Sequence, residues 1–127
     1  MSRLHQILLF VRRGNLDRAV QFYSEGIGLD ILDVGETLAR LHAGVASAPY
    51  LALKVVDGNE AVLSTGYGPF LNFTVNDFDL KIPQLIQMGA QLDGTIEYTE
   101  GGKIAALRSP DGHMIGLHEL TNGSGVY

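Results

Sequence analysis

The side chains that could hold a ligand or a metal ion are few in this chain. There are four histidines and no cysteine, which excludes disulfides, thiolate catalysis and cysteine-type zinc sites. Three of the histidines, His5, His42 and His118, could bind a divalent metal if the fold brought them together. The other interpretation is that they are polar groups near strand ends, hydrogen-bonded or solvated. The fourth, His113, follows a tight turn, so we expect it at the surface.

Two arginines are a second source of chemistry. Arg40 and Arg108 occupy comparable positions in two similar stretches of the sequence, on the third strand predicted in each. A guanidinium group can bind a carboxylate or a phosphate through two parallel hydrogen bonds. The alternative is that both arginines form ion pairs at the surface. Spacing alone supports no Ser-His-Asp arrangement.

An internal repeat must position these side chains. Residues 7–56 and 69–120 each read as a strand, a helix and three further strands. The helices open at Asn15 and Asp77, 62 residues apart, and the glycines that close them are 61 apart, at Gly28 and Gly89. A repeat of this size indicates architecture before function. Two curved half-sheets would enclose a groove that neither forms alone, so we look for function on the wall of that groove.

The repeat predicts a single domain, 1–127, made of two modules at 1–56 and 70–120. Residues 57–69 are rich in glycine and polar side chains and are interpreted as a linker. The tail after residue 120 is expected to fray. Pro83 predicts a kinked or irregular start to the second helix. The predicted strands are 7–11, 29–34, 37–42 and 50–56 in the first module, and 70–75, 91–98, 103–109 and 113–120 in the second.

Composition narrows the classes of partner. Fourteen acidic and nine basic residues give a net charge of −5 without a basic patch, which argues against nucleic acid. No stretch approaches 18 apolar residues, so we expect no membrane span. The absence of cysteine fits a reducing cytoplasm.

Several segments together resemble a known group. The string from Asn15 to Tyr23, followed by Gly28 and Leu29, is similar to the first-helix signature of the vicinal oxygen chelate superfamily. Residues 75–78, with 88–90, and the turn at 109–113 are similar to its second copy. This superfamily includes glyoxalase I, extradiol dioxygenases, fosfomycin resistance transferases and bleomycin-binding resistance proteins. The resemblance spans almost the whole chain, and it rests on the order and spacing of the motifs.

The resemblance implies an α+β fold in which two βαβββ modules form an eight-stranded, cupped, mixed sheet, usually in a homodimer. In the enzymes of the superfamily a divalent metal lies in the cup. Its ligands, typically His and Glu, come from the first and fourth strands of each module. The modules can pair within one chain or swap across a dimer, and the predicted linker permits either.

This chain departs from that ligand pattern. In the second module the two ligand positions fall on Phe70 and Gly116, neither of which binds metal through its side chain. In the first module the fourth-strand position falls on Ala52 or Leu53. The first-strand position falls on His5 or Gln6. At most one of the four ligands therefore remains, whereas a catalytic site usually supplies three. A rebuilt site would need His5, His42 and His118 to converge.

By the same resemblance, alternating residues on three strands face the cup. The predicted wall is aromatic and small, with a few polar tips, which suits an organic ligand held by stacking and hydrogen bonds. The ligand-binding candidates are Phe70, Asn72, His118, Tyr50, Arg40 and Arg108. The remaining residues predicted to face the cup are Thr74, Met114, Gly116, Ala52 and Lys54.

Three hypotheses follow. The first is a metal-free, cytoplasmic, homodimeric protein that sequesters an aromatic or largely apolar small molecule and has no cofactor. The second is a metal-dependent lyase or isomerase of the glyoxalase type, or a dioxygenase, with ligands in unusual positions. The third is an interaction module whose cup is occluded.

Overall fold

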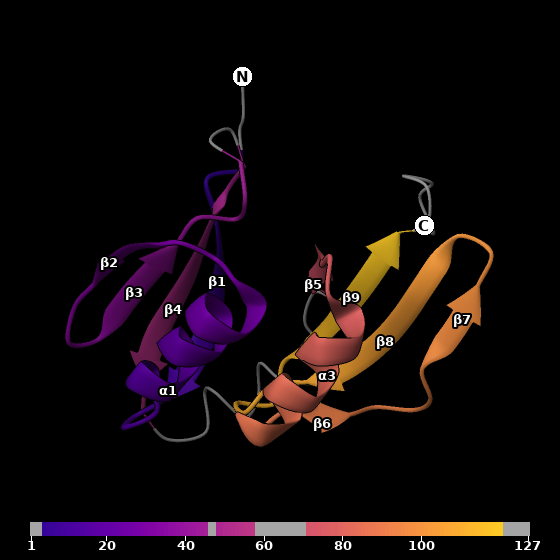
Figure 1. Ribbon diagram of the computed structural model, residues 1–127. Helices are drawn as coiled ribbons and strands as arrows, with labels where there is room; N and C mark the ends of the chain where they lie inside the picture. Colours follow the sequence, from indigo (N-terminus) through magenta and orange to yellow (C-terminus); the bar gives the residue numbers. More distant parts are fainter. Residues whose placement is uncertain (1–3, 46–47, 58–70, 121–127) are drawn as a thin grey trace. The chain divides into compact units, whose positions relative to one another are not determined.

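A computed structural model of the chain describes residues 4–45, 48–57 and 71–120. The chain divides into two compact units, Met1–Ser64 and Thr65–Tyr127, coloured indigo to magenta and orange to yellow in Figure 1. The division falls within the predicted linker at 57–69. Each unit contains a sheet with a helix on one face, so the predicted α+β class is confirmed.

The first unit has a four-stranded mixed sheet. Its strand order is β1-β4-β3-β2, with β1 and β4 parallel and the other pairs antiparallel. Every second residue faces the first helical segment, and these positions hold buried side chains such as Leu9, Leu41 and Leu53. The elements are β1 (Gln6–Arg12), α1 (Leu16–Gln21), η1 (Phe22–Ile27), β2 (Ile31–Val34), β3 (Leu38–Leu41) and β4 (Tyr50–Val56).

The first helical segment changes pitch midway. It is an α-helix as far as Gln21 and a π-helix over η1. The Ser24 hydroxyl donates to the Val20 carbonyl oxygen at 2.6 Å, and such a bond competes with the regular helical pattern. The segment ends as predicted at Gly28, whose φ of 104° favours glycine. Asn15 caps it through the backbone only, because its carbonyl oxygen accepts from the Ala19 N–H and its side chain forms no capping bond.

The second unit repeats this plan with one extra strand. Its order is β5-β9-β8-β6, and β7 also pairs with β8. The single strand predicted at 91–98 is wrong: β6 and β7 are separated by a turn at Gly94, which has a φ of 86°. Both short strands still pair with β8. The elements are β5 (Leu71–Thr74), α3 (Phe78–Gln87), β6 (Gln91–Leu92), β7 (Glu97–Thr99), β8 (Gly102–Arg108) and β9 (Met114–Leu120).

Helix α3 crosses one face of this sheet (Figure 1) and buries Phe78, Ile82 and Leu85. The irregular start predicted from Pro83 is wrong, because α3 is a continuous α-helix from 78 to 87. Pro83 leaves the carbonyl of Asp79 without its helical partner, and both residues are exposed, so water can satisfy that carbonyl.

The start of α3 is held by strands rather than by its own cap. Asp77 forms no side-chain capping bond. Instead the Phe78 N–H donates to the Glu119 carboxylate at 3.3 Å. The Lys103 ammonium lies 2.7 Å from the Asp79 carboxylate and 3.4 Å from that of Glu119, and the hydrogen bond to Asp79 raises the Lys103 pKa. In the described part of the chain, no helix has the length and apolar character needed to cross a membrane.

Candidate functional site

The face of the first sheet that points away from α1 carries the predicted wall residues. Across the parallel pair, Gln6 lies opposite Tyr50, Leu8 opposite Ala52, and Phe10 opposite Lys54. Leu53 lies on the other face and is fully buried. Ala52 is equally buried, but it alone of the two lies on the face away from α1. The fourth-strand position that the resemblance left between two residues is therefore Ala52.

The second sheet repeats this pairing. Asn72 lies opposite Gly116 and Thr74 opposite His118, on the face away from α3. Gly116 and Ala52 occupy corresponding positions in the two sheets, so their neighbours Asn72 and Leu8 correspond as well. The ligand position on the first strand lies two residues before Asn72 in the second unit, and two residues before Leu8 is Gln6. The first-strand ligand position, which the resemblance left between His5 and Gln6, is therefore Gln6. Its counterpart Phe70 lies outside the described residues.

Tyr50 is the centre of a polar and aromatic cluster at one end of the first sheet. The His5 ring packs edge-on at a centroid distance of 6.1 Å, and the His42 ring at 5.7 Å. The Arg40 guanidinium lies 5.9 Å from the centroid of the Tyr50 ring, within range of a cation–π contact. Three of the residues singled out from the sequence thus lie around the ring of a fourth.

Arg40 also has a partner of its own. Its guanidinium binds the Asp33 carboxylate on the neighbouring strand. The hydrogen bonds from Arg40 lower the Asp33 pKa, and those to Asp33 raise the Arg40 pKa. For Arg40 the structure therefore shows the surface ion pair that was the alternative to anion binding.

His118 and Asn72 form a polar pair on the open face of the second sheet. The His118 Nε2 lies 3.2 Å from the Asn72 Oδ1, and His118 is buried. Burial lowers the pKa of the His118 imidazole, because desolvation disfavours the charged form. A neutral imidazole can exchange hydrogen bonds with a ligand hydroxyl or amide.

The lowered pKa of His118 predicts a pH dependence of stability. The unfolded chain, with a histidine pKa of about 6.5, binds a proton at this residue more readily than the folded chain. Above that pH His118 is neutral in both states and does not affect stability. As the pH drops below it, protonation of the unfolded chain lowers the free energy of unfolding. Urea unfolding at pH 7, 6 and 5 should show this decrease, and His118→Gln should make it shallower. An equal decrease in the variant would assign it to other groups.

The prediction that His113 lies at the surface is wrong, because the residue is buried. The turn at 109–113 folds back on itself. The His113 N–H donates to the Ser109 hydroxyl at 3.0 Å, and its carbonyl oxygen accepts from the Ser109 N–H at 2.7 Å. The Arg108 guanidinium reaches the Gly112 carbonyl oxygen at 3.1 Å. These bonds draw the residue after the turn inward, an effect that a turn motif alone does not reveal.

The described residues do not fit the divalent metal that the resemblance implies. Gln6, Ala52 and Gly116 occupy three of its ligand positions and supply no imidazole or carboxylate. Within 4–45, 48–57 and 71–120, no group of three or more His, Asp or Glu side chains is placed to hold a metal ion. His5 and His42 lie in the first unit and His118 in the second.

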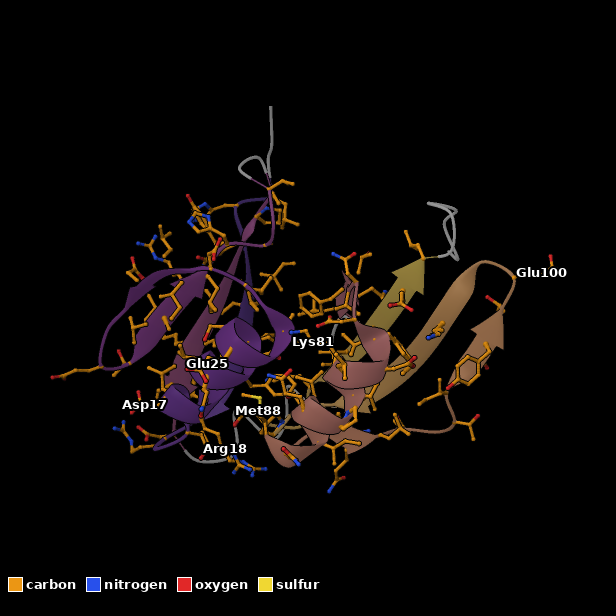
Figure 2. The ribbon with its side chains drawn as sticks, viewed as in Figure 1. Asp17, Arg18, Glu25, Lys81, Met88 and Glu100 are labelled. Atoms are coloured by element: carbon orange, nitrogen blue, oxygen red, sulfur yellow. The ribbon has the colours of Figure 1, made fainter. Side chains whose placement is uncertain are left out.

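A depression of about 300 Å³ in the first unit was not anticipated from the sequence. It lies between the turn after β1 and the β2–β3 turn, and Arg13 at its edge binds the Asp57 carboxylate at 2.6 Å. The nearby charged side chains Asp17 and Arg18 project outward from α1 (Figure 2). Only the clustering of turn glycines at Gly14 and Gly35 could have suggested it.

Residues 3–117 match the family model of the Glyoxalase/Bleomycin resistance protein/Dioxygenase superfamily. The chain belongs to this superfamily, which confirms the resemblance inferred from its motifs. No curated protein matches the chain.

Solved structures share the fold at low sequence identity. The chain is similar to a glyoxalase/bleomycin resistance protein/dioxygenase family enzyme from Burkholderia phytofirmans PsJN, with a TM-score of 0.75 and 18% identity over 94% of this chain and 100% of that one. It is similar to a glyoxalase-related enzyme from Fulvimarina pelagi, with a TM-score of 0.72 and 19% identity over 94% of this chain and 88% of that one. It is also similar to the fosfomycin resistance protein FosX from Mesorhizobium loti, with a TM-score of 0.70 and 17% identity over 96% of this chain and 95% of that one.

Proposed function

We propose that this protein is a metal-free, small-molecule-binding member of its superfamily, a cytoplasmic homodimer that sequesters an aromatic or largely apolar ligand. One observation carries the proposal. The corresponding positions Ala52 and Gly116, on the open faces of the two sheets, are held by the smallest side chains. Where the enzymes of the superfamily place a ligand to the metal, this chain has residues that cannot bind one through their side chains, and both positions are buried.

The surroundings of these positions support an organic ligand. On the first sheet the open face includes Leu8 and Leu38, which are 42% and 39% exposed, and the half-buried Phe10 and Tyr50. Exposed apolar side chains grouped beside polar tips are typical of ligand sites. The Tyr50 ring offers a face or an edge for stacking.

Metal-dependent chemistry is the second candidate, and one observation favours it. The imidazoles of His5 and His42 both contact Tyr50, so two possible metal ligands lie at the same end of the first sheet. A third ligand would have to come from elsewhere, with His118 as the candidate in the second unit.

Two measurements on the purified protein separate these candidates. Metal analysis should find less than stoichiometric nickel, zinc, manganese and iron. A thermal-shift screen of aromatic antibiotics and metabolites should find compounds that raise Tm by several degrees, since a ligand at 100 times its Kd stabilises by about 2.7 kcal/mol. A stoichiometric metal that is lost in His5→Ala or His118→Ala would overturn the proposal. A screen without a single stabilising compound would favour an occluded interaction module.

Tyr50 gives a sharper test once a ligand is found. Tyr50→Leu should weaken binding of this ligand by about two- to tenfold, because aromatic contacts contribute about 0.5–1.5 kcal/mol beyond buried area. The matched control is Tyr98→Leu, because Tyr98 is 68% exposed on β7. This variant should bind the ligand with the affinity of the parent protein. Titration calorimetry measures both. Equal affinities in the two variants would place the ligand away from Tyr50.

The homodimer is tested by light scattering coupled to size-exclusion chromatography. The chain has a mass of 13.7 kDa, so a dimer should elute at twice that mass. A monomer at micromolar concentration would remove that part of the proposal and leave ligand binding untouched.

A further inference from the structure

The ligand class can be narrowed by comparing the two arginines at corresponding strand positions. Arg40 and Arg108 are the half-buried arginines among the described residues. Arg40 is neutralised by Asp33. Arg108 donates one hydrogen bond to the Gly112 carbonyl oxygen and forms no ion pair with any described residue. That bond orients the Arg108 guanidinium and leaves its other N–H groups for an acceptor of negative charge.

The register places Arg108 on the open face of the second sheet. It lies opposite Met114 on β9 and Gln91 on β6. Lys103 and Leu107 are on the opposite face, where Lys103 binds the α3 residue Asp79. Beside Arg108, the centre of the open face is formed by Ala106 opposite Gly116, so no large side chain arises from the strands there.

The polar pair of His118 and Asn72 lies at the far side of this centre. His118 is opposite Ile104, four residues along the strand from the Arg108–Met114 pair. Four residues of strand span roughly 13 Å. The open face therefore has a guanidinium at one end, a hydrogen-bonding pair at the other, and a flat, small-residue floor between them.

We propose that this face of the second unit binds a flat organic anion, with its carboxylate or phosphate group on Arg108 and a polar group at its other end on Asn72 and His118. This inference rests on the proposed function and specifies its ligand class. The charge complementarity is local, because the chain as a whole carries a net charge of −5. A neutral ligand would leave the Arg108 donors without a charged partner.

The probes are chosen to match this spacing. They are 6-hydroxy-2-naphthoate, its neutral analogue 6-hydroxy-2-naphthamide, 2-naphthoate, and 2-naphthyl phosphate. Each is titrated by calorimetry into the 127-residue protein. The hydroxynaphthoate should bind at least about tenfold more tightly than the amide, as expected for charge-assisted hydrogen bonds. Arg108→Gln should erase that difference and Arg108→Lys should retain part of it. The control Arg18→Gln makes the same charge change at an exposed position of α1 and should leave the difference intact.

Each remaining outcome decides a point. The parent protein should bind 2-naphthoate, which lacks the hydroxyl, more weakly than 6-hydroxy-2-naphthoate, whereas Asn72→Ala should bind the two equally. If 2-naphthyl phosphate binds more tightly than the carboxylates, phosphate is the preferred anion. Equal binding of acid and amide overturns the inference while the proposed function stands. An acid preference that survives Arg108→Gln also overturns it. Binding by none of the probes overturns it as well, and the proposed function is then judged by the thermal-shift screen alone.

Discussion

Replacing Gly102 with alanine should destabilise the second unit by about 3 kcal/mol or more. Gly102 opens β8 with a φ of 139°, a region that side chains other than glycine rarely adopt. A Cβ atom there would overlap the Glu119 carbonyl oxygen, and it would lie 3.0 Å from the Glu119 carbonyl carbon and 3.2 Å from the Leu120 Cα. All three atoms belong to the backbone of β9, so relief requires the two central strands to separate.

The matched control is Gly94→Ala. Gly94 also has a positive φ, of 86°, but a Cβ atom there meets nothing within 4 Å. It should cost only the backbone strain, about 1 kcal/mol. Urea unfolding followed by far-UV circular dichroism measures both variants. If the two glycines cost the same, the close approach of β8 and β9 at Gly102 is not as the structure describes it.

Phe78→Ala should destabilise the protein by about 3–5 kcal/mol, the range for truncating a buried aromatic side chain. Phe78 is fully buried as the first residue of α3, and it lies where the helix is tied to the sheet through Glu119. Its loss leaves a cavity at the place where helix and strands are joined, so little of the cost can be recovered by collapse.

Leu80→Ala on the same helix is the control. Leu80 is 74% exposed, so its truncation should change the free energy of unfolding by less than about 0.5 kcal/mol. The same urea titration compares the two. Similar values for both variants would contradict the packing of α3 on β9 and β8.

The strand pair β8–β9 also carries the proposed binding face of the second unit. The β8–β9 pair that Gly102 permits also aligns Arg108, Ala106 and His118 on one face. A variant that disturbs this register should therefore lose the acid preference of the second unit before it loses secondary structure. Hydrogen exchange of the β9 amides, measured beside naphthoate titrations, would follow the two effects together.

Much of the fold could be predicted because it is encoded locally. The period-two pattern of Leu51 and Leu53 marks β4, and the 3.6-residue pattern from Leu16 marks the first helical segment. The repeat then predicts the same plan in the second half. Two predictions from local rules were wrong. Gly94 divides the predicted strand 91–98 into β6 and β7, and Pro83 is accommodated within α3 because its face of the helix is exposed to solvent.

The site divides in the same way. The sequence by itself determined that imidazole and carboxylate are missing from most of the superfamily's metal positions, because residue type follows directly from a motif count. Only the tertiary structure decided between Ala52 and Leu53 and between Gln6 and His5, because strand pairing, not spacing, determines which face a side chain occupies. It alone showed that Arg40 has a carboxylate partner and that Arg108 has none among the described residues. Side-chain pairing across strands depends on residues that are distant along the chain.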